Sequence, residues 1–249
     1  MKKTLCLHLS LTVILICFSN CKKEEPNRCL KNAGENITEK RDACNFSYLD
    51  VKDHLNVIIK QESACQIELK GGAKLLPYIK TEVIGDTLYI SNENQCNWLR
   101  DYEKQVDVSL SVNDLKKITF SGSGEISSLD TIRVSAIEVW LKGATGSVNL
   151  SLEAYSVKGV VAKESGDLTL SGRAEWAALY AQNTNGRIIC ENFETNSTYI
   201  YNDGTADCSV YANNWLQADI HYIGSVYYKG SPGEIIESVT GKGKLIKHR

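Results

Sequence analysis

The chain has 249 residues, a formal net charge of −2 and nine cysteines. A slightly acidic balance of this kind argues against nucleic acid or an anionic membrane surface as the partner. The length is sufficient for one continuous hydrophobic core.

The first 20 residues have the pattern of an export signal. Lys2 and Lys3 supply the positive start, and the 14 residues Leu5–Phe18 are mostly apolar. This stretch is too short for a membrane-spanning helix and has the length of the apolar region of a signal peptide. We expect residues 1–20 to be removed during export.

Cys21 follows this segment directly. The run Phe-Ser-Asn-Cys resembles the lipobox of bacterial lipoproteins, with Phe18 where Leu is usual and Asn20 where Gly or Ala is usual. We therefore expect residues 1–20 to be a lipoprotein signal peptide and Cys21 to be acylated. The next residues, Lys-Lys-Glu-Glu, resemble the tag that directs some Bacteroidetes lipoproteins to the cell surface. We expect an outer-membrane lipoprotein at the cell surface; a periplasm-facing protein and a soluble secreted protein are the alternatives.

Residues 21–45 are polar, contain Pro26 and Gly34, and show no strong period, so we expect a tether and lead-in. From residue 46 apolar and polar residues alternate, which predicts strands. These early strands lack a regular repeat. We expect them to form irregular coils, or a cap over the open end of a stack, within a β-helix domain that spans residues 46–249.

The stretch from Leu115 to Arg249 repeats one pattern. A turn recurs at steps of 22, 20, 20, 20, 18 and 19 residues, with glycine in every place except one; the turn residues are Gly124, Gly146, Gly166, Gly186, Ala206, Gly224 and Gly243. A near-constant period of this length is typical of a solenoid and too short for a strand followed by a long helix. We expect the glycines to supply the positive φ that a tight turn requires.

Apolar residues alternate with polar ones around each turn, as in a strand. The column two residues after the turn consists of Ile126, Val148, Leu168, Ile188, Cys208, Val226 and Leu245. Stacking the copies about 4.8 Å apart places each of these side chains on its equivalent in the next copy. The predicted fold is all-β, a single-stranded right-handed parallel β-helix with coils of about 20 residues that are regular over about 115–247.

Six cysteines remain outside the signal and the predicted lipid anchor. They are Cys29, Cys44, Cys65, Cys96, Cys190 and Cys208. An even number in an exported chain suggests disulfides, and proximity in sequence favours Cys29–Cys44 and Cys65–Cys96 among the fifteen possible pairings. Cys190 and Cys208 belong to adjacent inward columns of neighbouring coils. That diagonal exceeds the ~7 Å Cα limit of a bridge, so we expect two buried thiols.

Four segments together resemble one known family. They are Val83–Asn92, Ile118–Ile126, Gly224–Gly233 with its Tyr-Lys-Gly-Ser-Pro run, and Val239–Leu245. They are similar to the head GIN domain family, the head region of autotransporter-type adhesins, which is common in Bacteroidetes lipoproteins. The resemblance covers about residues 48–245. It implies a right-handed β-helix and an adhesin-like surface protein, and it carries no catalytic residues.

The sequence contains no established catalytic or metal-binding pattern. GxSxG, HExxH and CxxC do not occur, and no His lies at ligand spacing from a Cys. Asp207, Asp219, His221 and Lys229 are expected near one another on neighbouring coils, but scattered charges usually form a solvated surface. We expect no catalytic residue, no cofactor and no metal. The alternative is an enzyme of the β-helix lyase or hydrolase type that acts on extracellular polysaccharide.

Outward aromatic residues recur in the later copies. We expect Trp140, Tyr180 and Tyr199 at matching outward positions, with Tyr201 nearby and Trp215 in a later coil. Repeated flat apolar rings suit stacking on sugars or gripping another protein, although the same rings can simply stabilise a sheet. The candidate binding face therefore consists of Trp140, Tyr180, Tyr199, Tyr201 and Trp215.

The sequence as a whole predicts a surface-exposed lipoprotein with an adhesin-like binding or scaffolding role toward a glycan or a surface protein. A purely structural subunit is a third possibility, because a solenoid end exposes unpaired strand edges. The sequence leaves the oligomeric state open.

Overall fold

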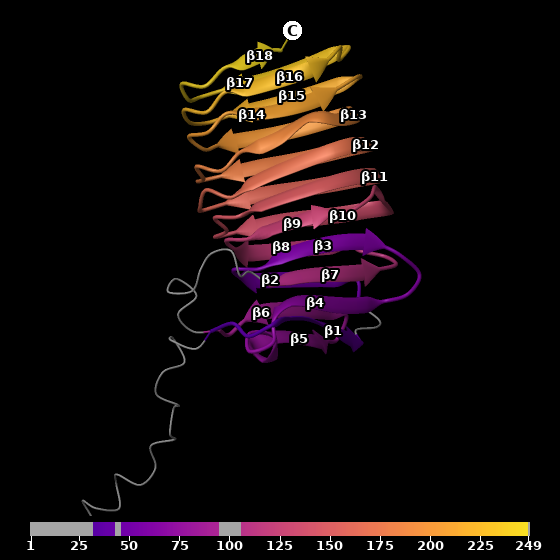
Figure 1. Cartoon of the computed structure of the whole chain (residues 1–249). Coiled ribbons are helices and arrows are strands. Elements are labelled where there is room, and N and C mark those ends of the chain that lie inside the picture. The colour runs from indigo at the N-terminus through magenta and orange to yellow at the C-terminus, as the bar shows by residue number, and fades with distance from the viewer. Residues whose placement is uncertain (1–31, 43–45, 95–105, 249) are drawn as a thin grey trace, which may run out of the picture. The chain divides into compact units, whose positions relative to one another are not determined.

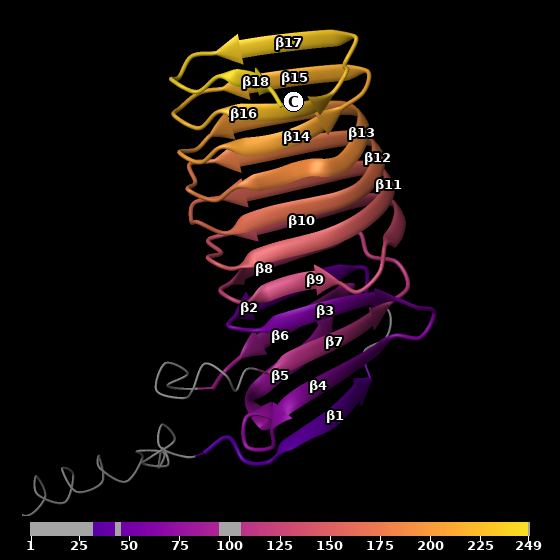
Figure 2. The ribbon, with the colours of Figure 1, turned by 45° about the horizontal axis from the view of Figure 1, so that its top comes forward.

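The computed structural model describes residues 32–42, 46–94 and 106–248. From Ala33 onward these residues belong to one compact unit, built of strands, turns and the short 3-10 helix η2 (Leu76–Tyr78). Within this unit the strands are stacked along one axis (Figures 1 and 2). The predicted signal peptide and Cys21 lie outside the described residues. None of the described helices is long and apolar enough to span a membrane.

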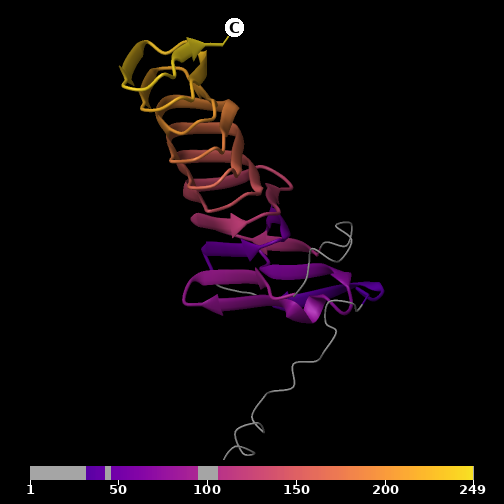
Figure 3. The same cartoon turned by 90° about the vertical axis from the view of Figure 1, so that its left-hand side faces the viewer.

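Each regular coil contributes one strand to each of two parallel sheets, and Figure 3 shows the coils one above another. The first sheet contains β9 (Glu125–Ser128), the first halves of β11 (Ser147–Ala162), β12 (Asp167–Gln182) and β13 (Ile188–Asp203), then β14 (Cys208–Ala212), β16 (Val226–Gly230) and β18 (Leu245–Lys247). The second sheet contains β8 (Lys117–Gly122), β10 (Ile132–Lys142), the second halves of β11, β12 and β13, then β15 (Trp215–Ile220) and β17 (Glu234–Val239). All of these pairings are parallel, which confirms the predicted solenoid.

The predicted inward column forms the core of the first sheet. Ile126, Val148, Leu168 and Ile188 are completely buried. The strand register pairs each with the next, so that every apolar side chain contacts its equivalent in the coils above and below. Burial of apolar surface contributes about 25 cal/mol per Å². Repeating the same contact from coil to coil therefore stabilises the whole length of the stack.

One core position is polar. Asn202 is fully buried next to Ala181 in an inward column of the second sheet. Its Nδ2 donates to the carbonyl oxygens of Ala206 (3.2 Å) and Gly224 (3.1 Å), and its Oδ1 accepts a hydrogen bond from the backbone N–H of Gly204 (3.0 Å). Since the side-chain amide satisfies its donors and its acceptor, Asn202 can be buried without an unpaired polar group while it ties together the turns of adjacent coils.

The turn glycines are required by close backbone contact, which corrects the expected positive φ. None of the repeat glycines from Gly124 to Gly243 at the turn positions has a positive φ. A Cβ added to Gly146 would lie 2.0 Å from the carbonyl oxygen of Gly124, and one on Gly186 would lie 2.1 Å from that of Gly166. Each turn therefore rests directly on the backbone of the turn below.

The left-handed residue of the turn lies three positions earlier. Gly143 (φ 68°), Lys163 (φ 79°) and Asn183 (φ 46°) occupy it in successive coils. Two of these are not glycine, so the repeat pattern of glycines does not report the left-handed position.

A single extra residue interrupts the regular register. Thr169 pairs with Ile189, but Ser171 pairs with Asn192, so that β13 contains a bulge relative to β12. Beyond the bulge each residue of β12 pairs with the residue 21 positions later, instead of 20.

The first coil is inserted out of chain order. β2 (Tyr48–Asp53) and β3 (Asn56–Gln61) pair in parallel with β8 and β9 on one side. On the other side they pair in parallel with β6 (Thr87–Asn92) and β7 (Asp107–Val112). The chain thus forms this coil first, builds the end of the stack beyond it, and then returns past it.

Antiparallel strands close this end, as the predicted cap. β4 (Gln66–Gly72) pairs with β7, β5 (Ile79–Ile84) with β6, and β1 (Asn36–Asp42) with β4. The guanidinium of Arg41 holds β1 in place by donating to the carbonyl oxygens of Ile79 (2.6 Å) and Leu76 (3.0 Å). β1 lies within the segment expected as tether and lead-in, so β-structure begins before residue 46.

The opposite end of the described stack is uncovered. Ile235, Ile236 and Val239 of β17 are 40–43% exposed. Glu237 pairs with Ala218 in an inward column, so this column ends in a carboxylate. A charge at the edge of the core opposes pairing of a further strand.

Cys190 and Cys208 are free, and both are 1% exposed in the core of the first sheet. Burial raises the pKa of the Cys208 thiol to about 12 and raises the pKa of Cys190 far above its ordinary value. Cys29, Cys44 and Cys96 lie outside the described residues. The disulfides Cys29–Cys44 and Cys65–Cys96 therefore stay predictions.

We expect Gly186→Ala to lower the free energy of unfolding by about 1–3 kcal/mol, because its methyl group would lie 2.1 Å from the Gly166 oxygen and 2.9 Å from Cγ1 of Val161. Gly143→Asn is the matched control: the space around Gly143 is open, and Asn183 occupies the equivalent left-handed position. Urea unfolding followed by circular dichroism measures both. Equal destabilisation of the two variants would contradict the role of backbone contact.

We expect Cys190 and Cys208 to resist iodoacetamide at about pH 8 in the folded protein and to react after denaturation. A raised pKa keeps the thiol protonated, and burial denies the reagent access. Peptide mass spectrometry after a timed exposure reads both sites. Rapid labelling of either residue without denaturant would show that the core columns open in solution.

Candidate binding face

The outer surface of the second sheet carries the predicted binding residues. Alternate residues of its strands point outward and align from coil to coil in four rows. We call this surface the aromatic face. Its larger side chains are Lys117, Glu138, Trp140, Lys142, Lys158, Trp176, Tyr180, Tyr199, Tyr201, Trp215, Gln217, Asp219 and His221.

Tyr201 continues the row of Trp140 and Tyr180, which corrects the expected place of Tyr199. The register pairs Trp140 with Val160, Val160 with Tyr180, and Tyr180 with Tyr201. Tyr199 pairs with Ala178 and lies one row aside. The bulge in β13 causes the difference, because it moves every later residue of that strand by one position.

Ring contacts connect the coils on this face. The Tyr180 and Tyr199 ring centroids are 5.5 Å apart in an edge-on arrangement, and those of Tyr201 and His221 are 5.0 Å apart. Trp215 stacks on Trp176 at 5.4 Å, across the coil between them, where the small Ser197 leaves room. The sequence reasoning missed Trp176, although its spacing from Tyr180 already places it on the same side of the strand.

Trp140 lies among three lysines. The ammonium groups of Lys142, Lys158 and Lys117 are 4.5, 4.9 and 5.0 Å from its ring centroid. The indole Nε1–H donates to Oε2 of Glu138 at 2.7 Å. This hydrogen bond, with the charges of Lys117 and Lys158, holds the pKa of the Glu138 carboxyl below its ordinary value.

The later coils of the face carry carboxylates instead. The Tyr199 hydroxyl donates to Oδ2 of Asp219 at 2.8 Å, and Gln217 Nε2 donates to the same carboxylate. Burial raises the pKa of Tyr199, and the hydrogen bond to Asp219 raises it further. The face is therefore basic around Trp140, aromatic in its middle coils and acidic around Asp219.

The aromatic row both stabilises the sheet and remains accessible. Val160 points outward yet is only 2% exposed, since it lies between Trp140 and Tyr180 in the row. The rings of Trp140, Tyr180, Tyr199, Tyr201 and Trp215 are themselves half-buried, so each keeps part of its surface open to solvent.

Comparison with known families identifies the fold. The model described as "Putative auto-transporter adhesin, head GIN domain" matches residues 45–232. The chain belongs to this family. A search of curated proteins found no match.

Solved structures share the fold of this GIN domain at low sequence identity. A "putative adhesin" from Bacteroides fragilis is 22% identical with a TM-score of 0.79, covering 86% of this chain and 97% of its own. A "putative adhesin" from Parabacteroides merdae is 19% identical with a TM-score of 0.62, covering 87% and 97%. A "Putative lipid binding protein" from Parabacteroides distasonis is 20% identical with a TM-score of 0.65, covering 87% and 98%.

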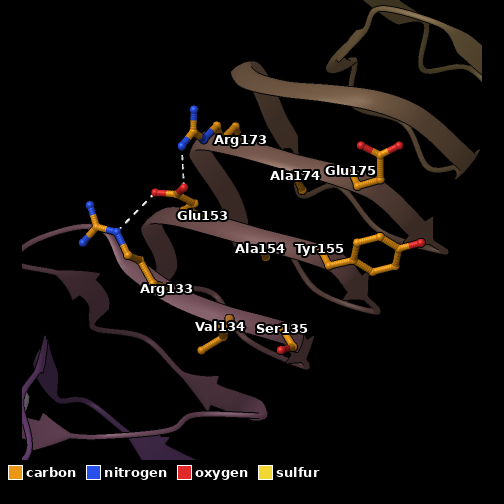
Figure 4. Close-up of a pocket in the computed structure, with 9 residues that line it drawn as sticks. All are labelled: Arg133, Val134, Ser135, Glu153, Ala154, Tyr155, Arg173, Ala174 and Glu175. Carbon is orange, nitrogen blue, oxygen red and sulfur yellow. Dashed lines mark hydrogen bonds and ion pairs between the residues drawn. The ribbon is translucent and has the colours of Figure 1, made fainter.

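The GIN domain has a second hollow, of about 700 Å³, where the coils bend between the sheets. Figure 4 shows its two borders, with the Arg133, Glu153 and Arg173 side chains on one and Tyr155 and Glu175 on the other. Glu153 pairs with Arg173 and with Arg133, the latter at 3.2 Å from Nε. These charges neutralise one another as a ladder along the bend, and Tyr155 is left 70% exposed.

The structure separates the residues that the sequence suggested for catalysis. Asp219 and His221 lie on the aromatic face, whereas Lys229 lies on β16 of the first sheet and pairs with Glu191 at 3.5 Å. Asp207 accepts a hydrogen bond from the backbone N–H of Ser225 at a turn. Within the described part of the GIN domain, no three His, Cys, Asp or Glu residues are grouped to hold a metal ion.

Proposed function

We propose that this GIN-domain protein is a lipid-anchored, cell-surface protein of adhesin type that binds a glycan through its aromatic face. The observation that carries the proposal is the contact of half-exposed rings from successive coils on one outer surface, at 5.0–5.5 Å between centroids. Aromatic rings present flat apolar surfaces on which the apolar faces of sugar rings stack. Neighbouring coils repeat about every 4.8 Å, which is close to the length of one sugar unit in an extended polysaccharide.

Polar groups beside the rings support a sugar rather than a purely apolar partner. Gln217 and Asp219 offer hydrogen-bonding atoms next to Tyr199, and His221 lies against Tyr201. Sites for small polar ligands combine aromatic walls with a few fixed polar groups in this way. The family description and the adhesin names of the structural neighbours agree with a binding role.

The proposed anchor rests on the start of the chain. A positively charged beginning, an apolar stretch and the lipobox-like run before Cys21 favour acylation of that cysteine. The acylated protein would lie on the outer membrane, and the Lys-Lys-Glu-Glu run after Cys21 favours the outer surface.

We expect the double variant Tyr180→Ala/Tyr201→Ala to bind glycan at least about tenfold more weakly than the wild type, since two stacking surfaces are lost. A glycan array identifies the ligand, and titration calorimetry compares affinities. Tyr155→Ala removes an exposed ring outside the face and is the control. Equal affinity of the double variant and the wild type would overturn the proposed face. Release of new reducing ends from the bound glycan would indicate an enzyme, and capture of proteins with no glycan bound would indicate a protein receptor.

We expect Cys21→Ser to abolish labelling with a radioactive fatty acid and to release the protein from the membrane fraction, because serine provides no thiol for acylation. Replacing the Lys-Lys-Glu-Glu run by alanines should keep the label but protect the protein from protease added to whole cells. Persistent membrane attachment of Cys21→Ser would refute the lipid anchor.

A further inference from the structure

The lysines around Trp140 come from different strands and converge on one ring. Lys117 belongs to β8, Lys142 to β10 and Lys158 to β11, and all three ammonium groups lie 4.5–5.0 Å from the Trp140 centroid. The Lys158 ammonium is also 5.7 Å from the centroid of Tyr180. This cluster therefore forms the basic end of the aromatic face and extends toward its tyrosines.

Its positive charge is only partly neutralised. Lys117 pairs with Glu138 at 3.5 Å, and Glu138 is also held by the indole N–H of Trp140. Lys142 and Lys158 contact the ring, and among the described residues neither forms an ion pair with a carboxylate. Because like charges held around one ring repel each other, an anion between them gains favourable interactions that water supplies less well.

A cavity opens beside the cluster. It has a volume of about 650 Å³ and is lined by Lys117, Glu138 and Lys158 of the cluster, together with Lys116 and the ring of Tyr48. This volume lies within the range of about 300–1,000 Å³ found for small-ligand sites. The lysines thus border a space that can hold a sugar unit.

We propose that Trp140, Lys117, Lys142 and Lys158 form an anion subsite of the aromatic face, which takes the carboxylate or sulfate group of an acidic saccharide. This proposal rests on the proposed function, and it specifies the chemical class of the glycan. The acidic group lies between Lys142 and Lys158, and the sugar chain continues along the row toward Tyr180. The ammonium groups occupy the surroundings of the Trp140 ring, so Trp140 orients the lysines while the tyrosines stack on sugar.

The charge pattern of the whole face favours an acidic saccharide over an anionic membrane. Asp203 and Asp219 point outward on the same sheet, a few coils from the lysines. A flat anionic surface laid against this face would meet these carboxylates as well as the lysines. A chain with spaced acidic groups can place a charge at the basic end and hydroxyl groups against the acidic end.

The test compares dextran sulfate, polygalacturonate and neutral dextran by titration calorimetry with the wild-type protein. We expect the wild type to bind at least one of the two acidic polymers, and to bind neutral dextran at least about tenfold more weakly. The double variant Lys142→Gln/Lys158→Gln, which keeps side-chain length but removes the charge, should lose at least about tenfold in affinity for the acidic polymer. Added salt should weaken wild-type binding and have little effect on the variant.

Lys229→Gln, on the first sheet, is the matched control and should bind like the wild type. If Lys142→Gln/Lys158→Gln is folded by circular dichroism and binds the acidic polymer as well as the wild type does, the anion subsite is refuted. Preference for vesicles of phosphatidylcholine and phosphatidylglycerol over both acidic polymers would also refute it, in favour of a membrane partner. Binding of neutral glycans that depends on Tyr180 and Tyr201 but not on the lysines would refute the subsite while preserving the proposed function; loss of all glycan binding in the wild type refutes both.

Discussion

The structure depends on one contact that is repeated from coil to coil: a backbone hydrogen-bonded in register with the coil below, which places each inward side chain on its equivalent. Val148 lies between Ile126 and Leu168 for this reason, and the turn at Gly146 rests on the carbonyl oxygen of Gly124 with no space for a methyl group. The spacing of coils is set by the hydrogen bonds. A side chain that is too large at the turn therefore disturbs the neighbouring coil as well as its own.

The same register arranges the outside of the molecule. Since the core fixes which residues face inward, the intervening residues must face solvent in aligned rows, and any ring or charge repeated at the coil period becomes a ladder. The Arg133–Glu153–Arg173 ladder at the bend and the ring contacts on the aromatic face arise in this way. They differ in consequence: the ladder satisfies its own charges, whereas the aromatic face keeps open ring surface and uncompensated lysines.

The two ends of the stack solve different problems. Antiparallel strands and the buried hydrogen bonds of Arg41 close the end near β1, where the chain must cover a coil that it formed earlier. At β17 the inward column ends in Glu237. A carboxylate at this position makes the apolar edge a poor site for another strand, so exposed Ile235 and Val239 do not by themselves indicate end-to-end assembly.

The sequence by itself determined the solenoid, the inward column from Ile126 to Val226, the burial of Cys190 and Cys208, and the family. These properties follow from a local period and from alternation along a strand, and both can be counted in the sequence. The site was predicted only in part: Tyr180, Tyr199 and Tyr201 were expected on one outer surface, but Tyr199 was given the place that Tyr201 occupies. That assignment depends on the bulge opposite Ser171, which shifts the pairing without changing the alternation of apolar and polar residues.

Only the tertiary structure decided which residues from distant coils meet. Lys117 and Lys158 are separated by two coil steps in sequence, and nothing local to either lysine indicates that both reach Trp140. The insertion of β2 and β3 between later strands was equally invisible, because strand pairing joins residues across the chain and does not depend on their order. The glycines were visible as a pattern, but their reason was not: a pattern shows that a small residue is needed, and only the stacked backbones show that the neighbouring carbonyl, rather than a left-handed φ, requires it.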